Sequence, residues 1–181
     1  MALEIWAAMI GLAILAPAVW LYNRLVAERN LVRQGYADID VQLKRRADLV
    51  PQLVEAVRGY AAHEKALLTS VAQLRSAALA AAKPDERFSH ERQLGERLQN
   101  LVLLQESYPQ LKADANFRDL STKLVQVEDA LQYARRFYNG AVKQYLTRIE
   151  SFPDNVMAKL FHFQPMPFFE TTERAPVKVT L

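Results

Sequence analysis

The sequence predicts an all-α protein: an N-terminal transmembrane helix, an antiparallel long-helix bundle of the four-helix type, and an aromatic, proline-rich C-terminal tail. Three observations lead to this prediction. The 181 residues include only 5 glycines and 8 prolines, so long stretches contain no residue that interrupts a helix. These stretches are rich in alanine, leucine, glutamine, arginine and glutamate, which favour helices. An uncharged apolar run precedes them, and apolar residues then recur at helical spacing.

The first element, residues 1–22, is interpreted as a membrane anchor. No charge occurs between Glu4 and Arg24, and a helix over residues 5–22 would span about 27 Å, close to the roughly 30 Å hydrocarbon core. Aromatic residues suited to the two membrane interfaces stand near its ends: Trp6, Trp20 and Tyr22. A cleaved signal peptide and a buried core helix are the alternatives. The first would begin with basic residues, and the second would usually carry polar ones.

The flanking charges predict the orientation of this segment. Basic residues follow it at Arg24, Arg29, Arg33, Lys44, Arg45 and Arg46, whereas only Glu4 and the terminal amine precede it. The positive-inside rule then places the C-terminal part in the cytoplasm, with a periplasmic location as the alternative. We therefore expect a single-pass protein with membrane lipid as one partner.

Residues 23–151 are predicted to form the bundle from four helices, over about residues 23–47, 48–82, 86–106 and 113–150. Asp48 would cap the second helix with Pro51 in its first turn, although a mere kink at Pro51 would fuse the first two helices. The fourth helix has the clearest seam, with apolar residues in steps of three and four: Phe117, Leu120, Leu124, Val127, Leu131, Ala134, Tyr138, Ala141 and Tyr145. Short connections make neighbouring helices antiparallel, which returns the chain towards the membrane.

Composition and motifs argue against an enzyme, a cofactor or metal site, and a nucleic-acid partner. Cysteine is absent, and the net charge of +3, from 23 basic and 20 acidic residues, gives no concentrated basic face. His63, His90 and His162 lack metal-motif spacing, and no phosphate loop or nucleophile elbow occurs. Glu128 and Asp129 could contribute to a buried site, but surface pairing is the default expectation.

Two sets of polar residues have structural interpretations. Asn23, Asn30 and Asn139 are predicted to fix the register of the bundle, because a polar residue in a helical seam can specify one alignment. The basic cluster of residues 44–46 is expected to cap a helix C-terminus, where cations interact favourably with the helix dipole. Lipid or nucleic-acid binding is the alternative for this cluster.

The tail, residues 152–181, is the best candidate for an interaction surface. Its phenylalanines alternate with Pro165, Met166 and Pro167, and the candidate residues are Phe161, Phe163, Phe168 and Phe169. Such a segment would expose more aromatic surface than a solvated tail should. It could pack on the bundle, dock on a neighbouring subunit or rest at the membrane interface. Packing on the bundle is favoured, since clustered aromatic residues are usually buried.

Several blocks resemble the LemA family over nearly the whole chain: Tyr22–Val26 with Arg29 and Asn30, Ile39–Pro51, Gly59–Glu64, Ala134–Asn139, Phe152–Asn155 and Pro167–Glu170. The resemblance implies a single-span helical bundle of bacteria without an established activity. One branch is similar to a protein of magnetosome membranes, so membrane organisation is implied by analogy. The family often has glutamine, threonine, asparagine and glycine where this chain has Ser121, Val127, Leu146 and His162.

These observations and the resemblance together predict a scaffold or assembly protein of the bacterial envelope, anchored in the inner membrane and self-associating as a homo-oligomer. The alternative is an adaptor or regulator of a membrane protease or another envelope complex. An adaptor would have an integral membrane protein as its partner.

Overall fold

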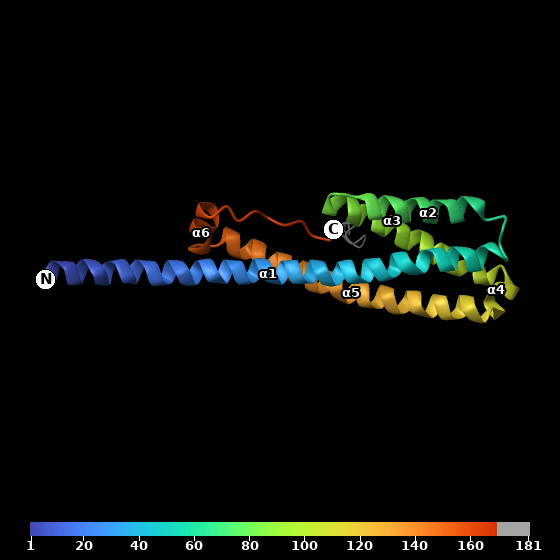
Figure 1. The fold of residues 1–181 in the computed structure, drawn as a ribbon, viewed down its shortest axis with the longest axis horizontal. Coiled ribbons are helices and arrows are strands. Elements are labelled where there is room, and N and C mark those ends of the chain that lie inside the picture. Colours follow the sequence, from blue (N-terminus) through green and yellow to red (C-terminus); the bar gives the residue numbers. More distant parts are fainter. Residues whose placement is uncertain (170–181) are drawn as a thin grey trace, which may run out of the picture. The chain divides into compact units, whose positions relative to one another are not determined.

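A computed structural model of the chain describes residues 1–169, and helices are the regular elements within that range (Figure 1). The predicted all-α fold is confirmed. In chain order the elements are α1 (Ala2–Arg58), α2 (Lys65–Ala80), α3 (Pro84–Leu103), the 3-10 helix η1 (Leu104–Glu106), α4 (Pro109–Ala113), α5 (Ala115–Glu150) and α6 (Asp154–Leu160). Residues 170–181 of the predicted tail lie outside the described residues.

The first helix is longer than the sequence predicts, because α1 continues through Pro51 to Arg58. The predicted helix end at Ala47 and new start at Asp48 are therefore wrong. Proline lacks the N–H that would bond the carbonyl four residues earlier, here that of Ala47. The Arg75 Nε donates to this carbonyl at 2.7 Å and satisfies it. Packing of the residues around Pro51 into the core then offsets the cost of proline in the helix.

The chain reverses after α1 rather than at Pro51. Residues 59–64 form the turn, where the amides of Ala61 and Glu64 donate to the carbonyls of Val57 and Ala61 at 2.8 and 3.1 Å. The second helix accordingly begins at Lys65 instead of Asp48. The other predicted helices agree with α3 and α5 to within a few residues.

The chain folds into two compact units. The first unit contains residues 1–38 and 135–168, and the second contains residues 39–134 together with Phe169. Both α1 and α5 contribute to each unit. On α5 the predicted seam is buried, apart from the half-buried Ala134. The spacing of apolar residues in steps of three and four therefore predicted the buried face of α5 correctly.

The second unit is built around a core in which the end of α1, the helices α2 and α3, and the start of α5 meet. Its most deeply buried members include Leu53, Val57, Val71, Leu94, Leu98, Leu101, Leu111 and Phe117. Asp114 caps α5, since its Oδ1 accepts the Phe117 amide at 2.7 Å. This bond, with one from the Tyr60 hydroxyl, lowers the pKa of the Asp114 carboxyl.

The first unit contains the apolar start of α1. This part of the helix is long and apolar enough to cross a membrane. Its large described side chains are exposed, including Ile5, Trp6, Met9, Leu12 and Leu15. A core helix would instead be mostly buried, so their exposure matches a surface meant for lipid.

Candidate membrane-proximal site

In the first unit, the segment after α6 runs back along α5. The Tyr145 hydroxyl donates to the Gln164 carbonyl at 2.8 Å, and the Tyr138 hydroxyl donates to the Pro167 carbonyl at 2.7 Å. The two tyrosines are one heptad apart, about 10.5 Å along a helix. Three extended residues cover about 10 Å, so the two bonds fix an extended segment in register with α5. Two tyrosines of the predicted seam thus also hold the tail.

The Tyr145 hydroxyl stays a hydrogen-bond donor over the physiological pH range. Burial raises the pKa of this phenol, while the positive charges of Arg29 and Arg33 act to lower it. The net direction is upward, so the proton remains on the oxygen that binds the Gln164 carbonyl.

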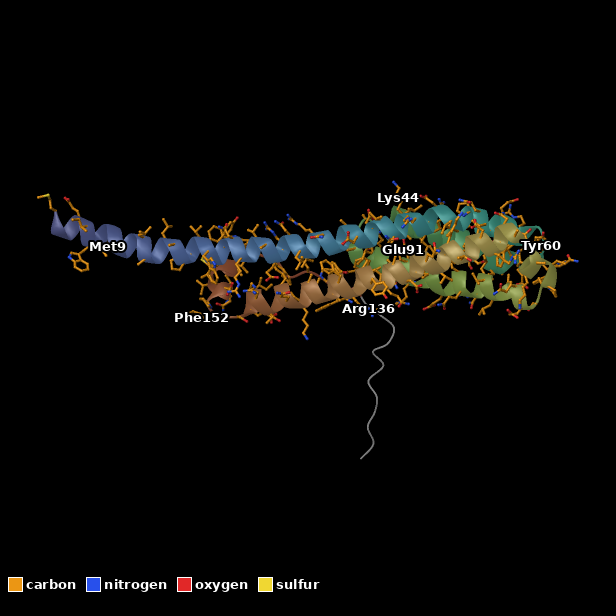
Figure 2. The ribbon with its side chains drawn as sticks, turned by 90° about the horizontal axis from the view of Figure 1, so that it is seen from below. Met9, Lys44, Tyr60, Glu91, Arg136 and Phe152 are labelled. Atoms are coloured by element: carbon orange, nitrogen blue, oxygen red, sulfur yellow. The ribbon has the colours of Figure 1, made fainter. Side chains whose placement is uncertain are left out.

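Aromatic contacts place the start of this segment beside the end of the apolar run. The ring of Tyr22 lies 4.8 Å from that of Phe161 and 5.9 Å from that of Phe163 between centroids. The Arg29 guanidinium lies 4.8 Å from the centre of the Phe163 ring, a cation–π contact. Because Tyr22 closes the apolar run of α1, the structure brings the C-terminal end of α6 to that level (Figures 1 and 2).

The tail phenylalanines divide into two pairs. Phe163 and Phe169 are buried, and the Phe169 ring packs 4.1 Å from that of Phe88 in the second unit. Phe161 and Phe168 remain 48% and 44% exposed. The four residues predicted as one interaction surface therefore have different surroundings, and only the exposed pair is accessible to a partner.

Helix α6 ends in a Schellman motif, which redirects the chain towards α5. The Phe163 amide donates to the Ala158 carbonyl at 2.9 Å, and the His162 amide donates to the Lys159 carbonyl at 3.3 Å. His162 has a φ of 55°, in the left-handed region where glycine is favoured. The motif requires this left-handed backbone after the last helical residue, and here a residue other than glycine adopts it.

Ion pairs join the three helices of the first unit. Arg148 on α5 lies 3.1 Å from the Glu28 carboxylate of α1 and 3.9 Å from the Asp154 carboxylate of α6. Gln144 also donates to Glu28 at 3.3 Å. The three charged side chains are only 8–15% exposed, so solvent screens these pairs less than it screens surface pairs. They fix α6 against the helices that hold the tail.

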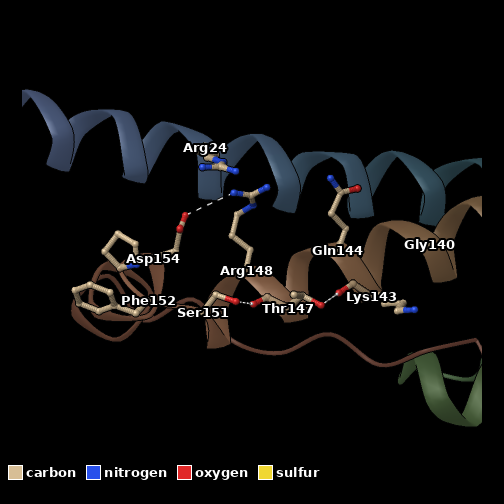
Figure 3. Close-up of a pocket in the computed structure, with 10 residues that line it drawn as sticks. Arg24, Gly140, Lys143, Gln144, Thr147, Arg148, Ser151, Phe152 and Asp154 are labelled. Carbon is tan, nitrogen blue, oxygen red and sulfur yellow. Dashed lines mark hydrogen bonds and ion pairs between the residues drawn. The ribbon is translucent and has the colours of Figure 1, made fainter.

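A groove of about 610 Å³ opens beside these ion pairs (Figure 3). Its lining comes from α1, the last turns of α5 and the turn into α6: Arg24, Gly140, Lys143, Gln144, Thr147, Arg148, Ser151, Phe152, Pro153 and Asp154. The hydroxyls of Thr147 and Ser151 donate to carbonyls one turn back, at 2.9 and 2.6 Å. The charged side chains therefore dominate the chemistry that the groove offers a ligand.

The remaining predicted site residues are only partly brought together. Trp6 and Trp20 are 63% and 60% exposed, as interface aromatics would be, and the Arg24 guanidinium lies 5.0 Å from the Trp20 ring centre. Asn23 and Asn30 are exposed, whereas Asn139 is half-buried. The register role stays a prediction, and Asn139 is the member best placed to fulfil it.

The second unit contains a buried charge cluster centred on Arg46, a residue that was not predicted to be buried. Arg46 is fully buried, and its guanidinium donates to the Glu128 carboxylate at 2.6 Å, the Glu91 carboxylate at 2.5 Å and the Glu91 carbonyl at 2.8 Å. A Cβ on Gly95 would lie 3.2 Å from the Arg46 Nη1, so glycine leaves room for the guanidinium. Burial disfavours the charge on Arg46, but the two carboxylates outweigh it and raise its pKa.

The expected capping role of residues 44–46 is wrong for Arg46, because α1 does not end there. Glu128, predicted to pair at the surface, belongs to this buried cluster instead. A signal was present: Arg46 follows Ile39 and Leu43 and precedes Val50 in steps of three and four. A charged residue in phase with an apolar stripe indicates a buried partner. Among the described residues, no group of three or more His, Asp or Glu side chains is placed to hold a metal.

The fold and this site define a helical protein with a candidate membrane span and a tail packed beside it. The chain belongs to the LemA family, whose sequence model matches residues 35–181. The predicted resemblance is thereby confirmed. The match begins after the apolar segment, so the family assignment does not depend on the candidate span.

Curated relatives are similar at low identity. Magnetosome protein MamQ 2 of Paramagnetospirillum magneticum is 23% identical over 184 residues, covering 87% of this chain and 68% of that protein. Protein LemA of Metamycoplasma hominis is 25% identical over 159 residues, covering 87% and 72%. Magnetosome protein MamQ of Magnetospirillum gryphiswaldense is 21% identical over 174 residues, covering 82% and 64%.

Proposed function

We propose that this LemA-family protein is a membrane-anchored helical scaffold of the bacterial envelope, located in the inner membrane, that self-associates through its tail. One observation carries the proposal: residues 152–168 of the tail pack in the same compact unit as the candidate span. Tyr22 contacts Phe161 and Phe163, and two tyrosines of α5 hold the tail backbone. An interaction surface built in this way would stand at a fixed level relative to the bilayer.

The exposed pair of tail phenylalanines supplies a surface for self-association. Phe161 and Phe168 keep nearly half of their area exposed although the neighbouring backbone is fixed. Covering the exposed half of a phenylalanine contributes about 0.7–1.5 kcal/mol, half the gain of full burial, and anchoring to one membrane raises the local concentration of subunits. Two such residues per subunit would therefore contribute to an interface between anchored copies. By analogy, two relatives that are magnetosome proteins support a role in organising membranes.

The double substitution Phe161→Ser/Phe168→Ser is expected to reduce the mass of the detergent-extracted particle without loss of helix content. Size-exclusion chromatography with light scattering measures the mass, and circular dichroism measures the helices. Phe163→Ser is the matched control, because it removes a buried ring of the same segment and should lower thermal stability instead. An unchanged mass in the double variant would contradict self-association through the tail. Stoichiometric co-purification of an integral membrane protein would favour the adaptor function.

The bundle is proposed to lie on the cytoplasmic side of the membrane. Arg24, Arg29 and Arg33 follow the apolar segment within three turns, and the positive-inside rule keeps such residues in the cytoplasm. A fluorescent protein fused after Leu181 is expected to fluoresce, because the C-terminus would lie in the cytoplasm. Activity of an alkaline phosphatase fusion at the same position would contradict this orientation, because it would show that the C-terminus lies in the periplasm.

A further inference from the structure

We propose that the groove beside the end of the apolar segment binds the phosphate of an anionic membrane lipid, while the exposed apolar side of α6 lies in the same leaflet. This inference rests on the proposed anchoring and adds to it a lipid class and a second contact with the bilayer. The occupant is the headgroup of a lipid from the membrane that α1 enters. Position, charge and apolar exposure support it independently.

The position of the groove matches the level of lipid headgroups. Tyr22 ends the apolar run, and Arg24, which lines the groove, follows it within about 3 Å along the helix. The contact between Tyr22 and Phe161 brings the end of α6 to the same level. Headgroup regions add about 5–8 Å to each side of the hydrocarbon core, so the end of the groove at Arg24 lies where phosphates would lie.

The charges that line the groove favour an anion. Three cationic side chains line it against one carboxylate. Arg148 is already neutralised by Glu28 and Asp154. Arg24 and Lys143 make no ion pair with a carboxylate anywhere in residues 1–169, and Arg24 is oriented by its contact with the Trp20 ring. Arg24 therefore offers an exposed, uncompensated cation at the level of the headgroups, and Lys143 adds positive charge farther along the groove (Figure 3).

One side of α6 exposes large apolar side chains that no other part of the described chain covers. Phe152 is 82% exposed, and Val156 and Leu160 on α6 are 56% and 65% exposed. These residues are four apart, so Val156 and Leu160 share one side of the helix and Phe152 stands before it at the corner with α5 (Figure 2). Phe152 also lines the groove, so its lining includes an aromatic ring as well as cationic side chains (Figure 3). A basic site with an adjoining apolar surface fits a lipid better than a free anion.

Native mass spectrometry of the full chain in neutral detergent tests the headgroup site. We expect bound phosphatidylglycerol on the wild-type protein, and about 10- to 30-fold weaker binding by Arg24→Gln/Lys143→Gln, from the loss of two cations. Lys65→Gln/Arg97→Gln is the control, because it removes two exposed cations outside the groove and should leave binding unchanged. Equal binding of phosphatidylcholine, or equal loss in the control, would overturn the proposal. Binding of inorganic phosphate as tight as that of the lipid would also overturn it.

Depth measurement in lipid nanodiscs tests the contact of α6 with the bilayer. The chain has no cysteine, so Val156→Cys accepts a single nitroxide label. We expect this label to be protected from a water-soluble relaxation agent and accessible to oxygen. Ser76→Cys, at an exposed position of the second unit, should show the opposite accessibility. A water-accessible label at Val156 in a protein that still partitions into membranes would overturn the lipid contact alone. Failure of the full chain to enter membranes would refute the anchoring itself.

Discussion

Replacing Arg46 with methionine is expected to lower the free energy of unfolding by about 3–5 kcal/mol. The substitution leaves the Glu91 carboxylate, which is 2% exposed, without the guanidinium that compensates its charge. Removing one partner of a buried ion pair costs more than the pair contributes, because the remaining charge stays desolvated. Thermal and denaturant unfolding of the full chain in mild detergent, followed by circular dichroism, measures the loss.

Two comparisons separate this cause from a general effect of removing arginine. Arg45→Met changes an exposed neighbour whose side chain bonds Gln42 at 3.5 Å, and should alter stability by no more than about 0.5 kcal/mol. The triple variant Arg46→Met/Glu91→Leu/Glu128→Gln also removes the two carboxylates. It should therefore be more stable than Arg46→Met and regain most of the free energy of unfolding that the single substitution loses. A triple variant as unstable as Arg46→Met would mean that the shape of the guanidinium, rather than its charge, holds the three helices together.

Helical periodicity predicted those parts of the fold in which one face of a helix is buried. The seam of α5 was read from its sequence because apolar residues recur there without interruption. The end of the first helix was misplaced because Pro51 is a strong local signal. The helix continues through Pro51 because Arg75 of α2, 28 residues further along the chain, donates a hydrogen bond to the Ala47 carbonyl that the proline leaves without a partner. No local pattern contains that information.

The candidate site was only partly predictable for a similar reason. The aromatic composition indicated that the tail would make contacts, and Tyr22 was expected at the level where the tail arrives. Which phenylalanines are buried depends on the tail register that Tyr138 and Tyr145 set through backbone carbonyls. The groove unites Arg24 with residues more than a hundred positions later in the chain. The cationic side chains that line the groove come from both α1 and α5. They could be recognised as one site only from the pairing of these two helices in the structure.

Gly35 lies where α1 and α5 approach each other closely in the first unit. A Cβ at this position would lie 3.0 Å from the Tyr138 Cα and 3.1 Å from the Phe137 Cδ1. The first of these atoms is backbone and cannot move without shifting the helix. Gly35 is buried and shares its side of α1 with Val32 and Ile39, in steps of three and four. A larger side chain must therefore separate the helices that form the unit.

Gly35→Leu is expected to lower the free energy of unfolding by about 1–3 kcal/mol, even though leucine favours helices more than glycine does. The matched control is Gly140→Ala on α5, where an added Cβ meets no atom within 4 Å. That substitution should raise stability by up to about 1 kcal/mol, the difference in helix propensity. Because Tyr138 also binds the Pro167 carbonyl, Gly35→Leu should release the tail to proteolysis while Gly140→Ala leaves it protected. Stabilisation by both substitutions would mean that α1 and α5 are farther apart at Gly35 than the structure places them.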